Sequence, residues 1–368
     1  MTDKVKVAIV GLGFGAEFIP IYQRHPDAEL YAICQRNEKN LNEVGDAFGV
    51  ERRFTSFEEL IADPELDAVH INSPIADHAW MSLDALRAGK HAASTVPMAT
   101  TVEECLEIAR ASAETGKKYM MMETAVYGRE FLYAKELVES GKLGKIQFMR
   151  GSHQQNMGLP GWPDYWYGFP PMHYATHAVS PLLALAKTTA EYVVCHGSGR
   201  ISDEYAAKYD SPFAAETSTM KLKDSDLAIE VTRSLFDTIR QYRESFDVYG
   251  TKLSFEWEQI AEEGAVIFSG FEDAERITIP DFAHYLPDEI APFTTGGVYD
   301  EEHEHTSFIQ GSGHGGSHPH MVHEFVRAIV EDRDPYPNAK TSANWTMAGI
   351  CSHTSALNGG ERIYIPEP

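Results

Sequence analysis

The feature that most restricts the fold is a short apolar run that ends in closely spaced glycines. Residues 5–10 read VKVAIV and lead directly into Gly11, Leu12, Gly13, Phe14 and Gly15, after which the chain has helical character. Glycines between a strand and a helix allow a tight turn, close approach of a pyrophosphate to the backbone, and packing of the helix on the strand. We therefore predict that these five residues bind a dinucleotide cofactor.

A second predicted strand, residues 29–34, ends where the dinucleotide-binding pattern places the group that reads the ribose. The residues that follow this strand are Gln35 and Arg36. An acidic residue would bind the 2′-hydroxyl of NAD and repel the 2′-phosphate of NADP, whereas glutamine and arginine can hydrogen-bond to either group. The expected cofactor is therefore NAD or NADP.

Strands and helices continue to alternate as far as residue 123. The segments 66–74, 90–95 and 118–123 are typical of buried strands, and Thr101 with Glu104 predicts a capping box at the start of a helix that runs to Gly116. We predict that residues 1–125 form a Rossmann domain with a doubly wound parallel sheet. Its ligand is expected beyond the C-terminal ends of the strands.

The pattern changes to alternating apolar and polar residues from Gly144 onward. Segments such as KIQFMRGSHQ (145–154), LAIEVTRSLF (227–236) and FDVYGTKLSFEW (246–257) indicate an open, mostly antiparallel sheet with one packed face. Residues 126–368 are therefore predicted to be an α/β domain for substrate binding and oligomerisation. Its free face would bind substrate or a second subunit, and the helical tail 319–359 would pack on the sheet or on the first domain.

Composition excludes several classes of partner. The chain has 55 acidic and 31 basic residues, and its formal net charge of −24 disfavours binding to nucleic acid or to anionic membranes. The start of the sequence has no signal-peptide pattern and no later segment is apolar enough to span a bilayer, so the cytoplasm is the expected location. The four cysteines lie far apart and are expected to be reduced core thiols.

The segments VAIVGLGFGA, LDAVHINSPIADHAWMSLDALRAGKHAASTVPMATTVEE and YGTK (249–252) resemble the glucose-fructose oxidoreductase/inositol dehydrogenase (Gfo/Idh/MocA) family. The resemblance extends over essentially the full chain. It implies a Rossmann domain, a second α/β domain with an open sheet, a nicotinamide cofactor, and a sugar or cyclitol as substrate. The residues that it implies on the cofactor side are Ser73, Pro74, His78, Thr95, Val96 and Pro97. Glu123 ends the last predicted parallel strand and is therefore expected on the nicotinamide side of the pocket.

The chain departs from this family at one important place. The family typically has Glu-Lys-Pro, with the lysine assisting proton transfer beside the nicotinamide, where this chain has Thr95-Val96-Pro97. Valine cannot hold a proton or polarise a hydroxyl group. We expect Val96 to form an apolar wall, and the acid–base chemistry to be carried out elsewhere.

The segment HYATHAVSP (173–181) provides the best acid–base candidates. If a helix begins at the preceding prolines, Tyr174 and His177 are three residues apart and His173 and His177 four apart, so that all three reach one ligand. Histidine titrates near neutral pH and can accept a hydroxyl proton, whereas Tyr174 needs a nearby cation to act as a base. The family's catalytic histidine aligns with His177. We predict His177 as the principal acid–base, with Tyr174 and His173 as partners.

One branch of the family, the NAD-dependent glycosidases of the α-N-acetylgalactosaminidase type, also lacks the lysine and has Val-Pro and Tyr-x-Thr-His motifs. This chain has Val96-Pro97 and Tyr174-Ala175-Thr176-His177, but alanines at 175 and 178 where that branch tends to have proline and glycine. The resemblance implies oxidation of one sugar carbon, removal of the neighbouring proton by Tyr174, loss of the glycosidic group, addition of water and return of the hydride.

Further candidates lie outside this segment. The histidines at 303–323 suggest a metal, but their ligands would have to converge from separate segments without a suitably spaced carboxylate, so we expect no metal site. His314 and its glycines are instead expected to close on the sugar, which His153 also contacts. Trp162, Tyr165 and Trp166 stack on a sugar face or fill a subunit interface.

Three functions are therefore considered from the sequence. The first is NAD(P)-dependent oxidation of a hydroxyl group of a sugar, glycoside or cyclitol. The second is redox-neutral, NAD-dependent cleavage of a glycoside. The third is a regulator that binds a sugar or nucleotide and has lost catalysis. The expected partners are a small carbohydrate and further copies of the chain, as a dimer or tetramer formed through the open sheet.

Overall fold

The computed structural model describes residues 4–240, 242–295 and 313–368. The chain divides into two compact units: the first unit comprises residues 1–129, 281–343 and 368, and the second comprises 130–280 and 344–367. This differs from a single division after residue 125, because residues 281–343 belong to the first unit. The physical reason is hydrophobic: Met321, Val322, Phe325 and Val326 are buried in the same core cluster as Val7 and other residues of the parallel sheet.

The first unit contains a six-stranded parallel sheet with strand order β3-β2-β1-β4-β5-β6. Its strands are β1 Val5–Val10, β2 Ala28–Cys34, β3 Arg53–Phe54, β4 Ala68–Ile71, β5 His91–Ser94 and β6 Tyr119–Met121. This is the strand order of dinucleotide-binding doubly wound folds, whose ligands bind beyond the carboxyl ends of the strands. The Rossmann sheet predicted from the sequence is confirmed.

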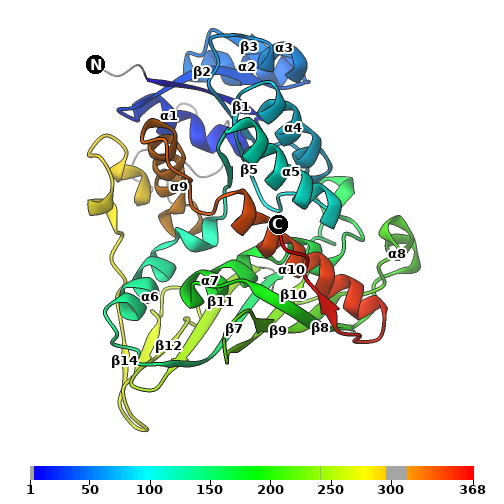
Figure 1. The fold of residues 1–368 in the computed structure, drawn as a ribbon, viewed down its shortest axis with the longest axis vertical. Helices are drawn as coiled ribbons and strands as arrows, with labels where there is room; N and C mark the ends of the chain where they lie inside the picture. The colour runs from blue at the N-terminus through cyan, green and yellow to red at the C-terminus, as the bar shows by residue number, and fades with distance from the viewer. Residues whose placement is uncertain (1–3, 241, 296–312) are drawn as a thin grey trace. The chain divides into compact units, whose positions relative to one another are not determined.

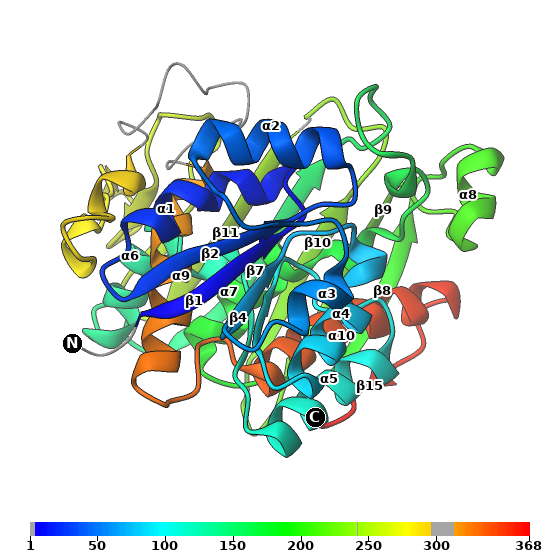
Figure 2. The ribbon, with the colours of Figure 1, turned by 90° about the horizontal axis from the view of Figure 1, so that it is seen from above.

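Helices pack on both faces of this sheet. They are α1 Ile19–Arg24, α2 Glu38–Phe48, α3 Phe57–Ile61, α4 Ile75–Arg87, α5 Val102–Thr115 and α9 Gly313–Val330. Helices α1 and α9 lie on one side of the strands and α4 and α5 on the other (Figures 1 and 2). The predicted capping box is present: the Glu104 backbone N–H donates to Thr101 Oγ1, and the Thr101 backbone N–H donates to the Glu104 carboxylate.

The second unit contains a nine-stranded sheet with strand order β14-β13-β12-β11-β7-β10-β9-β8-β15. Its strands are β7 Ile146–Gln155, β8 Ala190–Ser198, β9 Ala215–Leu222, β10 Ala228–Ser234, β11 Tyr242–Gly250, β12 Ser254–Glu256, β13 Val266–Phe268, β14 Ala274–Arg276 and β15 Ile363–Tyr364. Strand β10 is parallel to β7, and the other described pairs are antiparallel. The open, mostly antiparallel sheet is confirmed, although segment 246–257 forms two strands that flank a turn.

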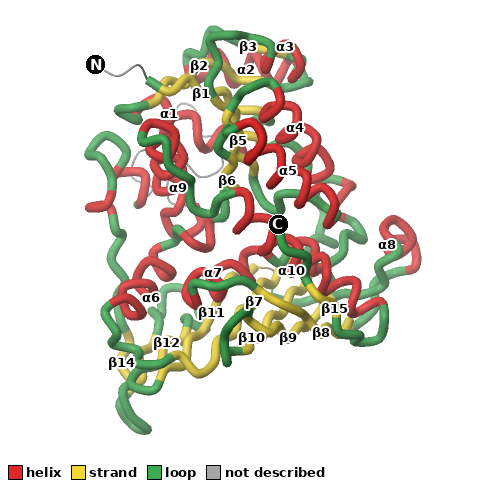
Figure 3. Tube along the Cα trace, viewed as in Figure 1, coloured by secondary structure: helices red, strands yellow, loops and turns green. Residues whose placement is uncertain are grey.

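One face of this second sheet is covered by helices. The helices of this part of the chain are α6 Arg129–Glu139, α7 Thr176–Ala186, α8 Asp203–Tyr209 and α10 Ala339–Leu357. Figure 3 shows α7 and α10 on one face, and no helix of the described residues on the other. Ser352 of α10 hydrogen-bonds to Ser218 of β9 over 2.9 Å. The helical tail is therefore divided, with α9 in the first unit and α10 largely on the second sheet, and oligomer formation through the open face stays a prediction.

Short 3-10 helices complete the described structure: η1 Phe14–Phe18, η2 Thr124–Val126, η3 Asp164–Trp166, η4 Pro171–Tyr174, η5 Ala283–Tyr285 and η6 Ala291–Thr294. All four cysteines are buried and unpaired, as expected. Within the described residues, no helix has the length and apolar character needed to cross a bilayer.

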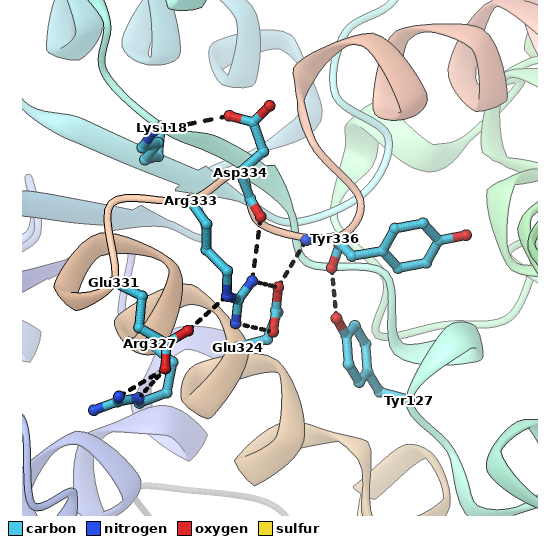
Figure 4. Close-up of polar contacts among 8 residues, drawn as sticks. All are labelled: Lys118, Tyr127, Glu324, Arg327, Glu331, Arg333, Asp334 and Tyr336. Atoms are coloured by element: carbon cyan, nitrogen blue, oxygen red, sulfur yellow. Dashed lines mark hydrogen bonds and ion pairs between the residues drawn. The ribbon is translucent and has the colours of Figure 1, made fainter.

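Polar contacts fix the chain that follows α9 within the first unit (Figure 4). The Arg333 guanidinium donates to both carboxylate oxygens of Glu324, over 2.5 and 2.8 Å. Glu324 also accepts from the backbone N–H of Tyr336 over 2.9 Å, and the Tyr127 hydroxyl donates to the Tyr336 carbonyl over 2.5 Å. A bidentate arginine–carboxylate contact is directional, so this network stabilises the path of the chain after α9.

Candidate active site

The glycine turn in the first unit has the geometry that a dinucleotide requires. Gly11 has a φ of +84°, and a Cβ there would lie 2.6 Å from the carbonyl oxygen of Asn72. At Gly15 a Cβ would lie 2.9 Å from the Ile9 side chain, whereas at Gly13 it would meet no described atom within 4 Å. Gly11 and Gly15 are thus required by packing, and Gly13 leaves open the approach that a pyrophosphate needs.

The two residues between these glycines contribute to the protein interior. Leu12 is buried, and the Phe14 ring packs edge-on against Phe18 and His318 at centroid distances of 5.3 and 5.5 Å. Their backbone groups are therefore the parts suited to a cofactor. The glycine turn fits a dinucleotide, and the individual contacts stay predictions.

The predicted ribose-reading residues lie at the end of β2. Gln35 Nε2 donates to Asn40 Oδ1 over 3.3 Å. The Arg36 side chain is 80% exposed and its guanidinium lies 3.7 Å from the Asp77 carboxylate. An exposed guanidinium with one weak ion pair remains able to bind a phosphate, so this end of the sheet suits either form of the cofactor.

His78 joins two of the predicted cofactor loops. Its Nδ1 lies 2.7 Å from the Pro97 carbonyl oxygen, and its Nε2 lies 2.8 Å from the Ser73 carbonyl oxygen and 3.2 Å from Thr95 Oγ1. Burial lowers the pKa of His78, and the two carbonyl groups oppose that shift. His78 therefore holds the Ser73–Pro74 turn, where α4 begins, against the segment after β5.

The remaining cofactor-side candidates are buried at the same end of the sheet. Val96 is buried and forms a cis peptide bond with Pro97. Glu123 is also buried, and its carboxylate accepts a hydrogen bond of 3.0 Å from the backbone N–H of Ala125. Glu123 thus caps η2, and a contact with the nicotinamide stays a prediction for both residues.

In the second unit, register brings four polar residues into one row across the sheet. His153 of β7 is opposite Glu244 of β11 and beside Arg233 of β10, and Arg233 is opposite Glu216 of β9. Paired residues on neighbouring strands project to the same face. We call Glu216, Arg233, His153 and Glu244 the polar row.

His177 and Tyr174 lie over the polar row. His177 belongs to α7 and Tyr174 to η4, and their ring centroids are 5.4 Å apart. The His153 ring lies 5.0 Å from His177 and 5.9 Å from Tyr174. His153 Nε2 is 3.8 Å from the Glu244 carboxylate. The cluster therefore combines His153, Tyr174 and His177, which the sequence predicted, with Glu244, which it did not.

Arg233 is a buried cation that lies beside Tyr174. Its guanidinium carbon lies 5.1 Å from the centre of the Tyr174 ring, and its Nε donates to the Tyr174 carbonyl over 2.7 Å. It also donates to the carbonyls of His153 and Ser234 and to Gln155 Oε1. Burial lowers the pKa of Arg233 to about 9, so it stays charged at neutral pH, and a neighbouring cation stabilises a phenolate.

Glu216 fixes the turn that carries Tyr174. Its carboxylate accepts from the Met172 backbone N–H over 2.7 Å, and its other oxygen lies 2.7 Å from His353 Nδ1 on α10. Both contacts are buried, where a charge-assisted hydrogen bond is strong. Glu216 therefore positions η4, which carries Tyr174.

His173 is separated from its predicted partners. Its ring packs against Phe169 and His353, at centroid distances of 6.0 and 5.0 Å. The chain is a 3-10 helix up to Tyr174 and bends at Ala175, where φ is −102° and ψ is 2°, before α7 begins. The spacing of one continuous α-helix therefore does not apply. Burial lowers the pKa of His173 to about 3, which suits a neutral packing role.

The aromatic segment adjoins the same cluster. The Trp166 ring lies 4.8 Å from Tyr174 and is 6% exposed, whereas Trp162 is 39% exposed. Tyr165 packs against Trp166 at 5.2 Å. Trp166 is thus a support for Tyr174, and stacking on a sugar or burial in an interface stay open for Trp162 and Tyr165.

His314 lies in the first unit. Its Nδ1 is 3.3 Å from His318 Nε2, and its ring is 5.9 Å from Phe14. The part of the 303–323 histidine cluster before residue 313 lies outside the described residues. Closure of His314 on a sugar stays a prediction.

A different group has the composition of a metal site. Among the described residues, His153, His177 and Glu244 offer ligand atoms that all lie within 4.8 Å of one another. The sequence suggested other ligand sets, because strand register is needed to bring His153 and Glu244 together.

Comparison with known proteins connects the first unit to a family. Residues 5–123 match the Gfo/Idh/MocA family model, described as "Oxidoreductase family, NAD-binding Rossmann fold". The resemblance to this family is confirmed. The match covers the segment that contains the glycine turn, Ser73, His78 and Thr95, so this domain is an NAD-binding Rossmann fold.

Curated relatives of the chain are named as glycosidases. An alpha-N-acetylgalactosaminidase of Shewanella oneidensis is 23% identical, with 99% of this chain and 85% of the relative aligned. A glycosyl hydrolase family 109 protein of Shewanella baltica is 26% identical over 65% of this chain, and the match spans 56% of the relative's length.

Solved structures share the fold of the whole chain. Levoglucosan dehydrogenase in complex with NADH has a TM-score of 0.82 at 18% identity, with 100% of both chains covered. An NAD binding oxidoreductase from Klebsiella pneumoniae has a TM-score of 0.80 at 19% identity, covering 99% of this chain and 100% of the other. Scyllo-inositol dehydrogenase from Lactobacillus casei has a TM-score of 0.74 at 19% identity, covering 99% of each chain. At these identities the likeness concerns the fold.

Proposed function

We propose that the protein oxidises a hydroxyl group of a sugar, glycoside or cyclitol by hydride transfer to NAD or NADP. The observation that carries the proposal is the cluster of His153, Tyr174, His177 and Glu244 on the covered face of the second sheet. It combines titratable groups with a buried cation, as acid–base sites do. The structural neighbours named for levoglucosan and scyllo-inositol support this substrate class.

In this proposal His177 is the principal acid–base. The substrate carbon loses its hydrogen as hydride, the hydroxyl oxygen loses its proton to His177, and a carbonyl group forms. NAD or NADP supplies the hydride acceptor when bound. Tyr174 assists the proton transfer, and Trp162, Tyr165 and His314 are the proposed further contacts to the carbohydrate.

A second candidate is redox-neutral cleavage of a glycoside, which a specific observation favours. Arg233 lies beside Tyr174 and stabilises its deprotonated form, which provides a second base in addition to His177. Elimination needs such a base, because Tyr174 must remove the proton on the carbon next to the transient ketone. The glycosidase names of the curated relatives support this candidate.

The test incubates the full-length protein with NAD or NADP and a panel of sugars, glycosides and cyclitols in deuterated water. Oxidation predicts accumulation of reduced nicotinamide absorbance. Cleavage predicts release of the aglycone, with deuterium at the carbon next to the oxidised one and no net reduction.

The control separates catalysis from binding. We expect His177→Ala to abolish turnover, and His196→Ala, which changes an exposed histidine of β8, to retain it. Carbohydrate binding without turnover in the unmodified protein would contradict both enzymatic proposals and favour a binding regulator.

A further inference from the structure

We propose that His153, His177 and Glu244 form a binding site for one divalent metal ion, with zinc as the ion that best matches these ligands. Their ligand atoms all lie within 4.8 Å of one another. His153 is fully buried and His177 is 4% exposed. Two imidazoles and one carboxylate are a ligand set of catalytic zinc sites, in which the fourth position stays open for water or substrate.

The ligands are carried by elements that fix their positions. His153 and Glu244 are directly opposite each other on the antiparallel strands β7 and β11, and His177 projects from the second position of α7, which packs on β7. Zinc ligands at about 2.1 Å in tetrahedral geometry are about 3.4 Å apart. His153 Nε2 and the nearer Glu244 oxygen are 3.8 Å apart, so small side-chain rotations bring this pair to the required spacing.

A supporting residue orients the carboxylate. The Tyr242 hydroxyl donates a hydrogen bond to Glu244 Oε1, the oxygen that lies 3.8 Å from His153 Nε2, and so helps to orient the carboxylate toward His153. Hydrogen bonds to metal-bound carboxylates of this kind tune affinity. Arg233 is the cation of the polar row. Its donors contact neutral oxygens, namely the carbonyls of Tyr174, His153 and Ser234 and the amide oxygen of Gln155.

The site gives a chemical reason for the missing lysine, and this part of the inference rests on the proposed function. Val96 cannot polarise a hydroxyl group, whereas a bound divalent ion stabilises an alkoxide and makes the hydroxyl more acidic. With an ion bound, His177 would be a ligand, so the acid–base role proposed above for His177 would pass to Tyr174, which lies beside Arg233. A nicotinamide, when bound, would accept the hydride from the substrate carbon, and the substrate hydroxyl group would become a carbonyl group.

The test measures binding of zinc alone. The full chain with NAD is treated with a chelator, dialysed and titrated with Zn²⁺ by calorimetry, and cobalt(II) absorption reports the coordination of the site. We expect one ion per chain, a loss of affinity greater than about 100-fold in His153→Gln and Glu244→Gln, and a loss of about 10- to 100-fold in Tyr242→Phe.

The matched control is His196→Gln, which makes the same chemical change at an exposed histidine of the same sheet and is expected to bind zinc like the unmodified protein. Thermal unfolding of every variant separates loss of a ligand from loss of the fold, and Tyr242→Phe is the mildest change. Zinc affinity that is equal in the unmodified protein, Glu244→Gln and Tyr242→Phe would overturn the metal site.

The two proposals fail in different ways. Stoichiometric zinc binding without oxidation of any carbohydrate would support the metal site and contradict the proposed oxidation. Carbohydrate oxidation that is complete in the chelated protein, together with absence of saturable zinc binding, would support the oxidation and overturn the metal site.

Discussion

The two units each contain a histidine group, and the groups have opposite electrostatic character. In the first unit His70 and His318 lie against the Phe18 ring at centroid distances of 4.5 and 4.7 Å. Burial lowers the pKa of His70 to about 3 and that of His318 well below its ordinary value, and it raises the pKa of Glu17 to about 8. All three groups are therefore neutral near pH 7.

The second-unit group contains a buried cation, Arg233. His153 lies between Arg233, which is charged at neutral pH, and Glu244, and the His177 ring lies 5.0 Å from the His153 ring. Histidine density in the sequence is greatest near residue 314, yet the group suited to proton transfer has only two histidines from separate elements. The comparison teaches that charged neighbours, and not the number of histidines, distinguish the group proposed for proton transfer from the packed one.

The strongest test of this comparison removes one histidine from each group. His177→Ala is expected to lower kcat by about 100- to 10,000-fold, the usual contribution of a general acid–base, with a small change in stability. His318→Ala is expected to leave kcat nearly unchanged and to lower the free energy of unfolding by about 3 kcal/mol through loss of buried contacts. Turnover assays and denaturant titrations measure both; a large loss of kcat in a fully stable His318→Ala protein would contradict the distinction.

Two glycines of the first unit separate folding from cofactor binding. Gly11→Ala is expected to destabilise the protein by about 3 kcal/mol or more, because a left-handed φ and a clash with the Asn72 carbonyl act together. Gly13→Ala has room for its methyl group and is expected to retain its Tm but to bind NADH about 10-fold more weakly, as the methyl occupies the pyrophosphate approach. Fluorescence titration and thermal unfolding test the pair; unchanged NADH affinity in Gly13→Ala would argue against this approach.

Glu17 is expected to make the free energy of unfolding of the protein depend on pH. Its pKa is raised from 4.5 to about 8, so the folded state holds a proton that the unfolded state releases, and stability decreases as pH rises between these values. Glu17→Gln removes this dependence and is expected to be about 4 kcal/mol more stable than the unmodified protein at pH 8, with little difference at pH 4. Denaturant titrations at both pH values check it; the opposite sign would mean that Glu17 is ionised in the fold.

The smallest expected effect concerns cofactor choice. Gln35→Asp is expected to raise the ratio of NADH to NADPH affinity by about 10-fold, because a carboxylate repels the 2′-phosphate and accepts from the 2′-hydroxyl. Arg36→Ala is the companion variant, since loss of its exposed guanidinium is expected to weaken NADPH alone. Titration with both reduced cofactors measures the ratio, and an unchanged ratio in both variants would mean that neither residue reads the ribose.

Local patterns in the sequence were sufficient for the first sheet and its cofactor turn. The glycines, the capping box at Thr101 and the strand alternation each depend on a few neighbouring residues, and each is present as predicted. Tyr174 and His177 were also predicted to lie together, and their rings do, although one residue ends a 3-10 helix and the other belongs to α7. The position of His173 could not be predicted, because the chain bends at Ala175 and the His173 ring packs against His353.

The sequence by itself determined the class of fold, the dinucleotide turn and the two side chains, Tyr174 and His177, that carry the proposed proton chemistry. Only the tertiary structure decided that residues 281–343 belong with the first unit and that Glu216, Arg233, His153 and Glu244 share a row. The physical reason is that periodicity specifies which face of a strand a residue occupies, whereas its cross-strand neighbours depend on strand order and register, which are set by packing of distant segments.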